Sequence, residues 1–280
     1  MHAMDSAKTE AAGIAGKDLI ARGASLPLAA RLWVPAAATG LIVFFPGGGF
    51  IDCELEEALP FLQALASHTG WAVLGAAYTT ARVSPFPAAA EDAHAVLRWA
   101  RRERRRLGCQ GELLVSAGIE AGGNLAAVSA LMARDRGGPQ LAGQMLLMPM
   151  LDPGLTSCSM RSVEDRAAER AADACALGYR GYLPRAMDRI HPYASPLQSS
   201  RLRGLPPALI LSTDDDPLRD EAVQYGAKLQ AAGVQARVRQ LPAAGIGRPQ
   251  ARCQCARKED VLQEMTAFLA GLGKESKNMA

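Results

Sequence analysis

The chain has 280 residues and a formal net charge of +3, and 49% of its residues are apolar. This length allows one sizeable domain with a well-buried core, and the composition is that of a globular protein. The small charge does not indicate a nucleic-acid partner, and no apolar stretch is long enough to span a membrane. The first ten residues carry an acid and no apolar run follows them, so we expect no secretory signal and a cytoplasmic protein.

Apolar runs and helical patterns alternate along the chain. In chain order, we predict strands at 28–34 and 40–45, a helix at 55–67, a strand at 71–78, a helix at 92–105, a strand at 112–117, a helix at 122–134 and a strand at 144–150. A strand at 208–212, a helix at 219–232, a strand at 236–240 and a helix at 260–272 complete the pattern. The central runs are apolar on both faces, as buried parallel strands are. This predicts an α/β fold with a mostly parallel central sheet and helices on both faces.

Residues 153–206 break this alternation. They contain a charged helical stretch at 163–175, Tyr179, Tyr182 and the loop HPYASPLQSS, but no buried strand. We interpret them as a small cap insertion over the carboxyl ends of the strands, where open α/β sheets bind ligands. Residues 1–280 are predicted to form a single domain that includes this insertion, with residues 273–280 as a frayed, disordered tail.

Cysteines and basic residues add little to the functional interpretation. The six cysteines follow no framework spacing and are expected to be reduced thiols. Cys253 and Cys255 form the one close pair, but a metal site would need two further ligands, so we expect neither a metal nor a cofactor. The arginines at 101–106 are interpreted as a solvated helix end in preference to an anion-binding patch.

The most informative stretch is GIEAGGN, residues 118–124, which follows a predicted strand and opens a predicted helix. That context is typical of a nucleophile elbow, a sharp strand-to-helix turn that presents a nucleophilic side chain between small residues. The central position here is Glu120, and Ala121 follows it.

Two further segments could belong to the same site. Gly47, Gly48 and Gly49 follow the strand at 40–45, and three glycines allow backbone amides to point into a site and stabilise an oxyanion. A plain flexible loop remains the alternative for these glycines. Asp216 follows the strand at 208–212, so the chain order is glycine loop, elbow and acid.

These segments together resemble the α/β-hydrolase fold and, within it, the hormone-sensitive-lipase-like esterases. The resemblance extends from about residue 28 to residue 248. The segments that match the family are YTTA at 78–81, PFPAA at 85–89, GGNLA at 122–126, PYASPL at 192–197, GLPPALI at 204–210 and DPLRDE at 216–221.

The departures from the family pattern bear on function. By this resemblance, Glu120 occupies the position of the nucleophilic serine, and Asp216 keeps the position of the triad acid. Ile246 stands at the position of the triad histidine, and Pro46 at the position of the histidine that opens the glycine motif. A covalent route through the elbow would therefore lack its base, because no histidine follows His191.

No other residue is expected to replace the missing groups. His94 is predicted to be exposed in the middle of a helix, and His68 to end one. His191 is the only histidine that we expect near the mouth of the site. Ser116 lies inside a predicted strand, so we do not expect it to act as the nucleophile.

A glutamate at the elbow would lie at a helix N-terminus, which favours negative charge. Its carboxylate could accept hydrogen bonds from the Gly48 and Ala121 amides, which would otherwise receive an oxyanion. It would then act as a built-in anion that blocks this oxyanion hole. Arg248, on the loop that lacks the histidine, is the candidate cation between Glu120 and Asp216.

Three interpretations of function stay open. The favoured one is a non-catalytic protein that binds a small acyl or ester-like molecule or a partner protein. The second is an active ester hydrolase, or another hydrolase, with a non-standard site that uses Glu120 and Asp216. The third is a structural or oligomeric relic. Because some relatives pair through the edge strand and last helix, a homodimer also stays open; no membrane or nucleic-acid partner is expected.

Overall fold

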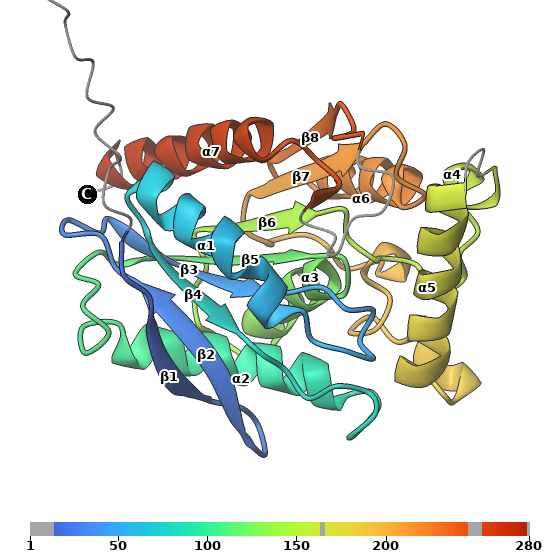
Figure 1. Ribbon diagram of the computed structural model, residues 1–280, viewed down its shortest axis with the longest axis horizontal. Helices are drawn as coiled ribbons and strands as arrows, with labels where there is room; N and C mark the ends of the chain where they lie inside the picture. The colour runs from blue at the N-terminus through green and yellow to red at the C-terminus, as the bar shows by residue number, and fades with distance from the viewer. Residues whose placement is uncertain (1–13, 163–165, 246–253, 279–280) are drawn as a thin grey trace, which may run out of the picture.

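The chain is described here by a computed structural model of residues 14–162, 166–245 and 254–278 (Figure 1). Its strands are β1 (Lys17–Arg22), β2 (Pro27–Trp33), β3 (Gly40–Phe45), β4 (Ala72–Ala76), β5 (Leu113–Ile119), β6 (Gly143–Leu147), β7 (Ala208–Thr213) and β8 (Ala236–Leu241). They form one sheet in the order β1-β2-β4-β3-β5-β6-β7-β8 (Figure 1). Strand β2 pairs antiparallel with β1 and β4, and every pair from β4 to β8 is parallel. The predicted α/β fold with a mostly parallel sheet is confirmed.

Among the strands in the described part of the chain, β1 is the one that the sequence did not predict. Its residues, KDLIAR, are largely exposed, and only Ala21 is buried in the core. An edge strand with so little buried surface has no apolar alternation that a sequence pattern could reveal.

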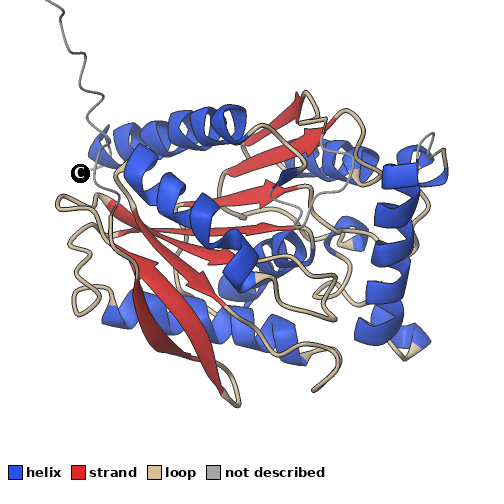
Figure 2. Ribbon diagram, in the orientation of Figure 1, coloured by secondary structure: helices blue, strands red, loops and turns tan. Residues whose placement is uncertain are grey.

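Helices cover both faces of the sheet, as predicted (Figure 2). Helices α1 (Leu55–Thr69) and α7 (Lys258–Asn278) share one apolar cluster with one face of the sheet. Helices α2 (Ala88–Glu103), α3 (Ala121–Asp135) and α6 (Arg219–Ala231) share a second cluster with the opposite face. None of the helices described is both long and apolar enough to cross a membrane.

The central strands are apolar throughout because both of their faces are covered. In β3, Leu41, Val43 and Phe45 pack toward α2 and α3, whereas Ile42 and Phe44 pack toward α1 and α7. Successive side chains of a strand point to opposite faces, so two helical layers require apolar residues at every position.

Helix α7 corrects the tail predicted at 273–280. The helix continues to Asn278, and residues 279–280 lie outside the described residues. The stretch KESKN at 274–278 contains no proline, and its lysines and glutamate have good helix propensity. Adding residues to an existing helix costs far less than starting one.

The described residues of the segment between β6 and β7, which was predicted as a cap, form four short or medium helices. These are α4 (Cys158–Arg161), α5 (Arg166–Tyr182) and the 3₁₀ helices η1 (Ala186–Ile190) and η2 (Pro196–Gln198). Helix α5 stands beyond the carboxyl ends of the central strands, at the right of Figure 1. It contacts the glycine loop closely: a Cβ on Gly178 would lie 2.3 Å from the Gly49 carbonyl oxygen, and Tyr182 stacks on Phe50 at 3.9 Å between ring centroids.

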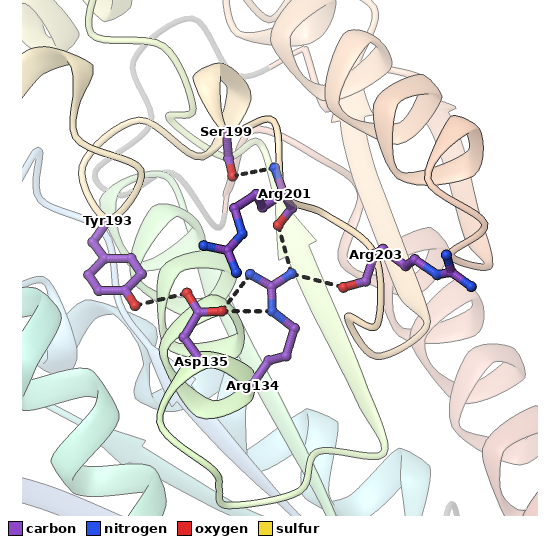
Figure 3. Close-up of polar contacts among 6 residues, drawn as sticks. All are labelled: Arg134, Asp135, Tyr193, Ser199, Arg201 and Arg203. Atoms are coloured by element: carbon purple, nitrogen blue, oxygen red, sulfur yellow. Dashed lines mark hydrogen bonds and ion pairs between the residues drawn. The ribbon is translucent and has the colours of Figure 1, made fainter.

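The end of this segment is fastened to the C-terminus of α3 (Figure 3). The Arg134 guanidinium donates to the Arg201 and Arg203 carbonyl oxygens at 2.6 and 3.0 Å. The Tyr193 hydroxyl donates to the Asp135 carboxylate at 2.9 Å. Because α3 begins at the elbow, the elbow and the returning chain of the cap share one rigid support.

Glu221 of α6 holds the chain that leaves β6. Its Oε2 accepts the Leu151 and Asp152 amides at 2.7 and 2.9 Å. Burial raises the pKa of Glu221 to about 8; the two amide bonds oppose this, and the Asp152 and Asp216 carboxylates reinforce it. Glu221 is therefore protonated in the folded protein at a pH at which it ionises in the unfolded chain.

We predict that Glu221 makes stability fall as the pH rises from about 5 to 8, since unfolding then releases its proton. Below about pH 4.5 the group is protonated in both states, and above about pH 8 it is ionised in both. Glu221→Gln should remove this dependence and gain roughly 3 kcal/mol relative to the wild type across that interval. Urea unfolding followed by tryptophan fluorescence at fixed pH values measures the difference.

The glutamine variant is a matched control because one side-chain oxygen can still accept both amides, as Oε2 of Glu221 does. Taking the difference between the two proteins removes the contribution of the other carboxylates. Parallel stability curves for wild type and variant between those pH values would show that Glu221 is ionised in the folded state.

Candidate functional site

Glu120 lies at a strained turn between β5 and α3. Its backbone has φ 55° and ψ −114°, which is uncommon for a residue with a side chain. The turn is held on both sides, because the Glu120 amide donates to the Leu147 carbonyl at 3.0 Å and the Met150 amide donates to the Glu120 carbonyl at 3.1 Å. The strand-to-helix turn expected from GIEAGGN is present.

Close backbone contacts explain the glycines on either side of Glu120. A Cβ on Gly118 would lie 2.1 Å from the Gly122 carbonyl oxygen. A Cβ on Gly122 would lie 1.9 Å from the Phe45 carbonyl oxygen, at the end of β3. The first turn of α3 therefore packs directly against the strand that leads into the glycine loop, which brings Glu120 close to that loop.

The glycine loop is a hydrogen-bonded turn. The carbonyl oxygen of Gly48 accepts the Ile51 and Asp52 amides at 3.1 and 2.9 Å. Gly48 has φ 111°, a conformation that side chains rarely allow. The buried Tyr78 hydroxyl donates to the Gly47 carbonyl at 2.9 Å, with a second contact to the Asp52 carbonyl at 3.2 Å. These bonds direct the loop amides toward the elbow.

The Glu120 carboxylate fills the space in front of these amides. Its Oε2 accepts the Gly48 amide at 2.9 Å and the Gly49 amide at 3.3 Å, and the residue is only 5% exposed. The same oxygen would lie 2.8 Å from a Cβ on Gly47, so only a glycine there leaves room for it. A carboxylate that accepts two backbone N–H groups is held by charge-assisted hydrogen bonds.

The second donor is Gly49, and not Ala121 as the sequence led us to expect. Glu120 precedes α3, and its side chain makes no capping hydrogen bond to that helix. Ala121 is the first residue of the helix, whereas a capping side chain normally reaches the second or third amide. The long glutamate side chain extends across to the glycine loop and away from its own helix.

Asp216 also lies at the carboxyl ends of the strands, three residues after the end of β7. It is buried, and its Oδ1 accepts the Leu218 amide at 3.1 Å. Strand β6 lies between β5 and β7, so the two strands that carry Glu120 and Asp216 are about 10 Å apart. The fold therefore places both predicted positions at the carboxyl ends of the strands. Among the described interactions, none is a direct contact between the two carboxylates.

The loop after β8 also begins at the carboxyl ends of the strands. The Ala243 amide donates to Asp214 at 2.9 Å, and Ala243 forms an isolated antiparallel bridge with Ala256. Ile246 and Arg248, the positions expected to lack the histidine and to supply a cation, lie outside the described residues, as does Cys253. Within the described ranges, no group of three or more His, Cys, Asp and Glu side chains could hold a metal.

The prediction that His94 is exposed is wrong. The residue is 3% exposed and lies on the face of α2 that also buries Ala90 and Leu97. Burial lowers the pKa of His94 to about 4, and the positive charges of Arg136 and Arg98 act in the same direction. His94 is therefore a neutral core residue and not a free base for the elbow.

His191 and Ser116 are accounted for by other contacts. His191 is exposed, its ring packs against Phe86, and its Nδ1 accepts the Tyr193 amide at 3.1 Å. Ser116 is fully buried between β5 and α3, within hydrogen-bonding distance of the Ala126 carbonyl and the Ser129 hydroxyl. Neither contact set prepares a base or a nucleophile at the elbow.

Two supporting residues were not singled out from the sequence. Tyr78 orients the glycine loop, and Asn124 donates from its side chain to the Met150 and Ala194 carbonyls at 2.8 and 3.1 Å. Both belong to segments that match the family pattern, YTTA and GGNLA, and this membership was the only available signal.

Comparisons with known proteins agree with this architecture. A protein-family profile described as the alpha/beta hydrolase fold matches residues 42–247. The chain is 34% identical to the esterase LipI of Mycobacterium tuberculosis over 226 residues, which cover 78% of this chain and 69% of that protein. It is also 34% identical over 143 residues to the human hormone-sensitive lipase, which covers 50% of this chain and 13% of that protein.

Solved structures of esterases have the same fold as this chain. A hyperthermophilic esterase from Pyrobaculum calidifontis superposes with a TM-score of 0.81 at 30% identity, over 92% of this chain and 86% of that chain. A thermostable esterase from Pseudomonas putida superposes with a TM-score of 0.79 at 28% identity, over 94% and 82% of the two chains.

The curated relatives are longer than the part that matches this chain. The alignments span 69% of LipI and 65% of the carboxylesterase NlhH of Mycobacterium tuberculosis. The matching part includes the glycine loop, the elbow and the acid at 216, all within residues 42–247. The chain thus belongs to the α/β-hydrolase fold family, in its hormone-sensitive-lipase-like group of esterases and lipases.

Proposed function

We propose that this protein binds a small acyl or ester-like molecule, or a protein partner, without hydrolysing an ester. The observation that carries the proposal is the pair of hydrogen bonds from the Gly48 and Gly49 amides to Glu120 Oε2, at 2.9 and 3.3 Å. The side chain at the nucleophile position occupies the donors that an ester oxyanion would need. The same proposal locates the protein in the cytoplasm, where its cysteines remain reduced.

The chemistry of acyl transfer supports this interpretation. A covalent route needs a nucleophile and a base that removes and returns a proton. The elbow residue is already engaged by two backbone donors, and the sequence contains no histidine after His191. Asp216 keeps the position of the triad acid, but an acid without an imidazole to orient cannot take over the role of the base.

Ligand binding does not need those groups. In open α/β sheets, ligands bind at the carboxyl ends of the strands, which is where the glycine loop, Glu120 and Asp216 lie. A bound ester would not place its carbonyl oxygen on the loop amides, because Glu120 holds them. The substrate carbonyl would remain unpolarised, which separates binding from reaction.

Ester hydrolysis is the second candidate function. The names of the relatives LipI and NlhH, an esterase and a carboxylesterase, favour it. In this case Glu120 would act as a general base on water, with Asp216 as the second carboxylate. Glu120 would first have to give up at least one of its two amide bonds.

We expect purified wild-type protein to show no turnover of p-nitrophenyl acetate or p-nitrophenyl butyrate above a protein blank. Glu120→Ser should remain at least about 10³-fold below a complete serine triad, because it restores an oxygen but not its base. Release of p-nitrophenol at neutral pH measures both, with the esterase LipI as the positive control.

The decisive comparison is between wild type and Glu120→Gln, which keeps the size of the side chain and removes its ability to act as a base. Wild-type turnover that disappears in Glu120→Gln would establish the hydrolase and end the non-catalytic proposal. Equal blank-level rates in both proteins are what the proposal requires.

We also expect Glu120→Ala to create a site for acetate. The substitution removes a CH₂–COO⁻ group, for which acetate is the nearest free equivalent, and it leaves the Gly48 and Gly49 amides vacant. The variant should lose about 1–3 kcal/mol of stability because two buried donors lose their acceptor. About 100 mM acetate should restore part of that loss, which thermal unfolding measures.

Sodium chloride at equal ionic strength controls for salt effects. Glu120→Gln controls for a change of side chain at position 120 that does not open the space in front of the amides. The glutamine oxygen refills the space in front of the amides, so acetate should stabilise neither that variant nor the wild type. An equal response of wild type and Glu120→Ala to acetate would mean that the Glu120 carboxylate does not occupy the hole in solution.

A further inference from the structure

Four large apolar side chains protrude from the cap side of the molecule. Val83 is 70% exposed, Leu177 62%, Met187 74% and Ile190 66%. Only three other large apolar residues in the described ranges are comparably exposed: Ile20, Leu26 and Val223. Side chains of this size normally lie in the core or in contacts. We call these four residues the apolar cap face.

The segments that carry the apolar cap face are in contact. The Phe86 amide, three residues after Val83, donates to the Tyr182 carbonyl at the end of α5 at 2.9 Å. A Cβ on Gly181, one turn after Leu177, would lie 3.9 Å from the Ala81 Cβ. The Phe86 ring also lies 5.2 Å from the ring of His191, the neighbour of Ile190. The four side chains therefore come from one continuous region.

Helix η1 presents two of these side chains on the same side. Met187 and Ile190 are three residues apart, and side chains at this spacing are eclipsed on a 3₁₀ helix. The helix is fixed from inside by Asp188, whose buried carboxylate accepts two hydrogen bonds from Arg185 at 2.8 and 2.9 Å. The exposure of Met187 and Ile190 is thus a property of an ordered turn.

Arginines border the apolar cap face. Arg82 and Arg185 form ion pairs with Asp52 and Asp188, whereas Arg180 and Arg189 have no ion pair within the described part of the chain. Asp173 lies one turn before Leu177 on α5, farther from η1. Residues 180–189 contain three arginines (Arg180, Arg185 and Arg189) and one aspartate (Asp188), so the net charge of this stretch is positive.

We propose that the apolar cap face docks onto an anionic phospholipid bilayer. Exposed apolar side chains bordered by arginines are the combination that adsorbs to a charged lipid interface, because apolar burial and electrostatic attraction add. Arginine stems lie along an apolar surface while the guanidinium reaches the headgroups. This proposal departs from the expectation of no membrane partner, which rested on the lack of an apolar stretch long enough to span a bilayer, because peripheral contact needs no such stretch.

The charges disfavour a second copy of this chain as the occupant. A two-fold symmetric contact would bring Arg180 and Arg189 of one molecule toward the same arginines of the other. Like charges facing each other across an interface oppose association. A lipid headgroup region supplies the opposite charge instead.

Docking at this face would bring the bilayer close to the candidate site. Helix α5, which carries Leu177, touches the glycine loop through Gly178 and Gly49, and Tyr182 of the same helix stacks on Phe50. The proposal is independent of whether Glu120 catalyses a reaction, because adsorption uses only the outer face of the cap.

Vesicle flotation tests the proposal with the full-length protein. Wild type should float with phosphatidylcholine vesicles that contain about 30% phosphatidylglycerol, and bind much less to pure phosphatidylcholine. Met187→Ser combined with Ile190→Ser should lower the partition coefficient at least about tenfold. Arg180→Gln combined with Arg189→Gln should reduce binding to the anionic vesicles alone.

Ile20→Ser is the matched control, because Ile20 is 65% exposed but lies on β1 outside the apolar cap face. It should bind like the wild type, and circular dichroism verifies that each variant is folded. No flotation of the wild type, or equal flotation of the Met187/Ile190 variant, overturns the proposal. A wild-type dimer in light scattering that becomes monomeric in that variant assigns the face to a second copy instead.

Discussion

The rest of the site depends on one interaction, in which the Gly48 and Gly49 amides donate hydrogen bonds to the Glu120 carboxylate. It joins the turn after β5 to the loop after β3, and it places negative charge beside the N-terminus of α3. Both the two amides and the helix dipole favour an anion at this point. In a serine esterase that anion forms only during the reaction, whereas in this structure the Glu120 side chain lies in its place. The interaction therefore stabilises the fold by the same electrostatics that would stabilise a transition state.

The surroundings of this contact restrict how far Glu120 can move. The Glu120 backbone is held between Leu147 and Met150, and the segment that contains Met150 is held in turn by Asn124 and Glu221. Tyr78 fixes the glycine loop from the other side. A strained residue persists only where its neighbours over-determine its conformation. The site thus keeps the rigid support that catalysis would need, although the residue that this support presents is not a hydroxyl nucleophile.

The sequence predicted what depends on local pattern, and it failed where three-dimensional direction decides. Strands apolar on both faces and the glycine spacing at 118–124 are local signals, and the parallel sheet and the elbow follow from them. Strand β1 carries no such signal because it lies at an edge and Ala21 is its one buried residue. The burial of His94 depends on which face of α2 turns inward, and the choice of Gly49 over Ala121 depends on the direction of one side chain. Neither can be derived from spacing alone.

Helix α5 and the elbow are linked through the glycine loop, and this link bears on the proposed binding. Gly178 of α5 touches Gly49, whose amide donates to Glu120, so a displacement of α5 changes the geometry of the hydrogen bonds that hold the carboxylate. A ligand that displaced Glu120 would therefore disturb the contact with α5 as well. Moving Glu120 leaves two buried donors unpaired unless the ligand supplies an acceptor of its own. This cost opposes any ligand that would displace Glu120, so the proposed acyl or ester-like ligand binds beside the carboxylate and not in its place.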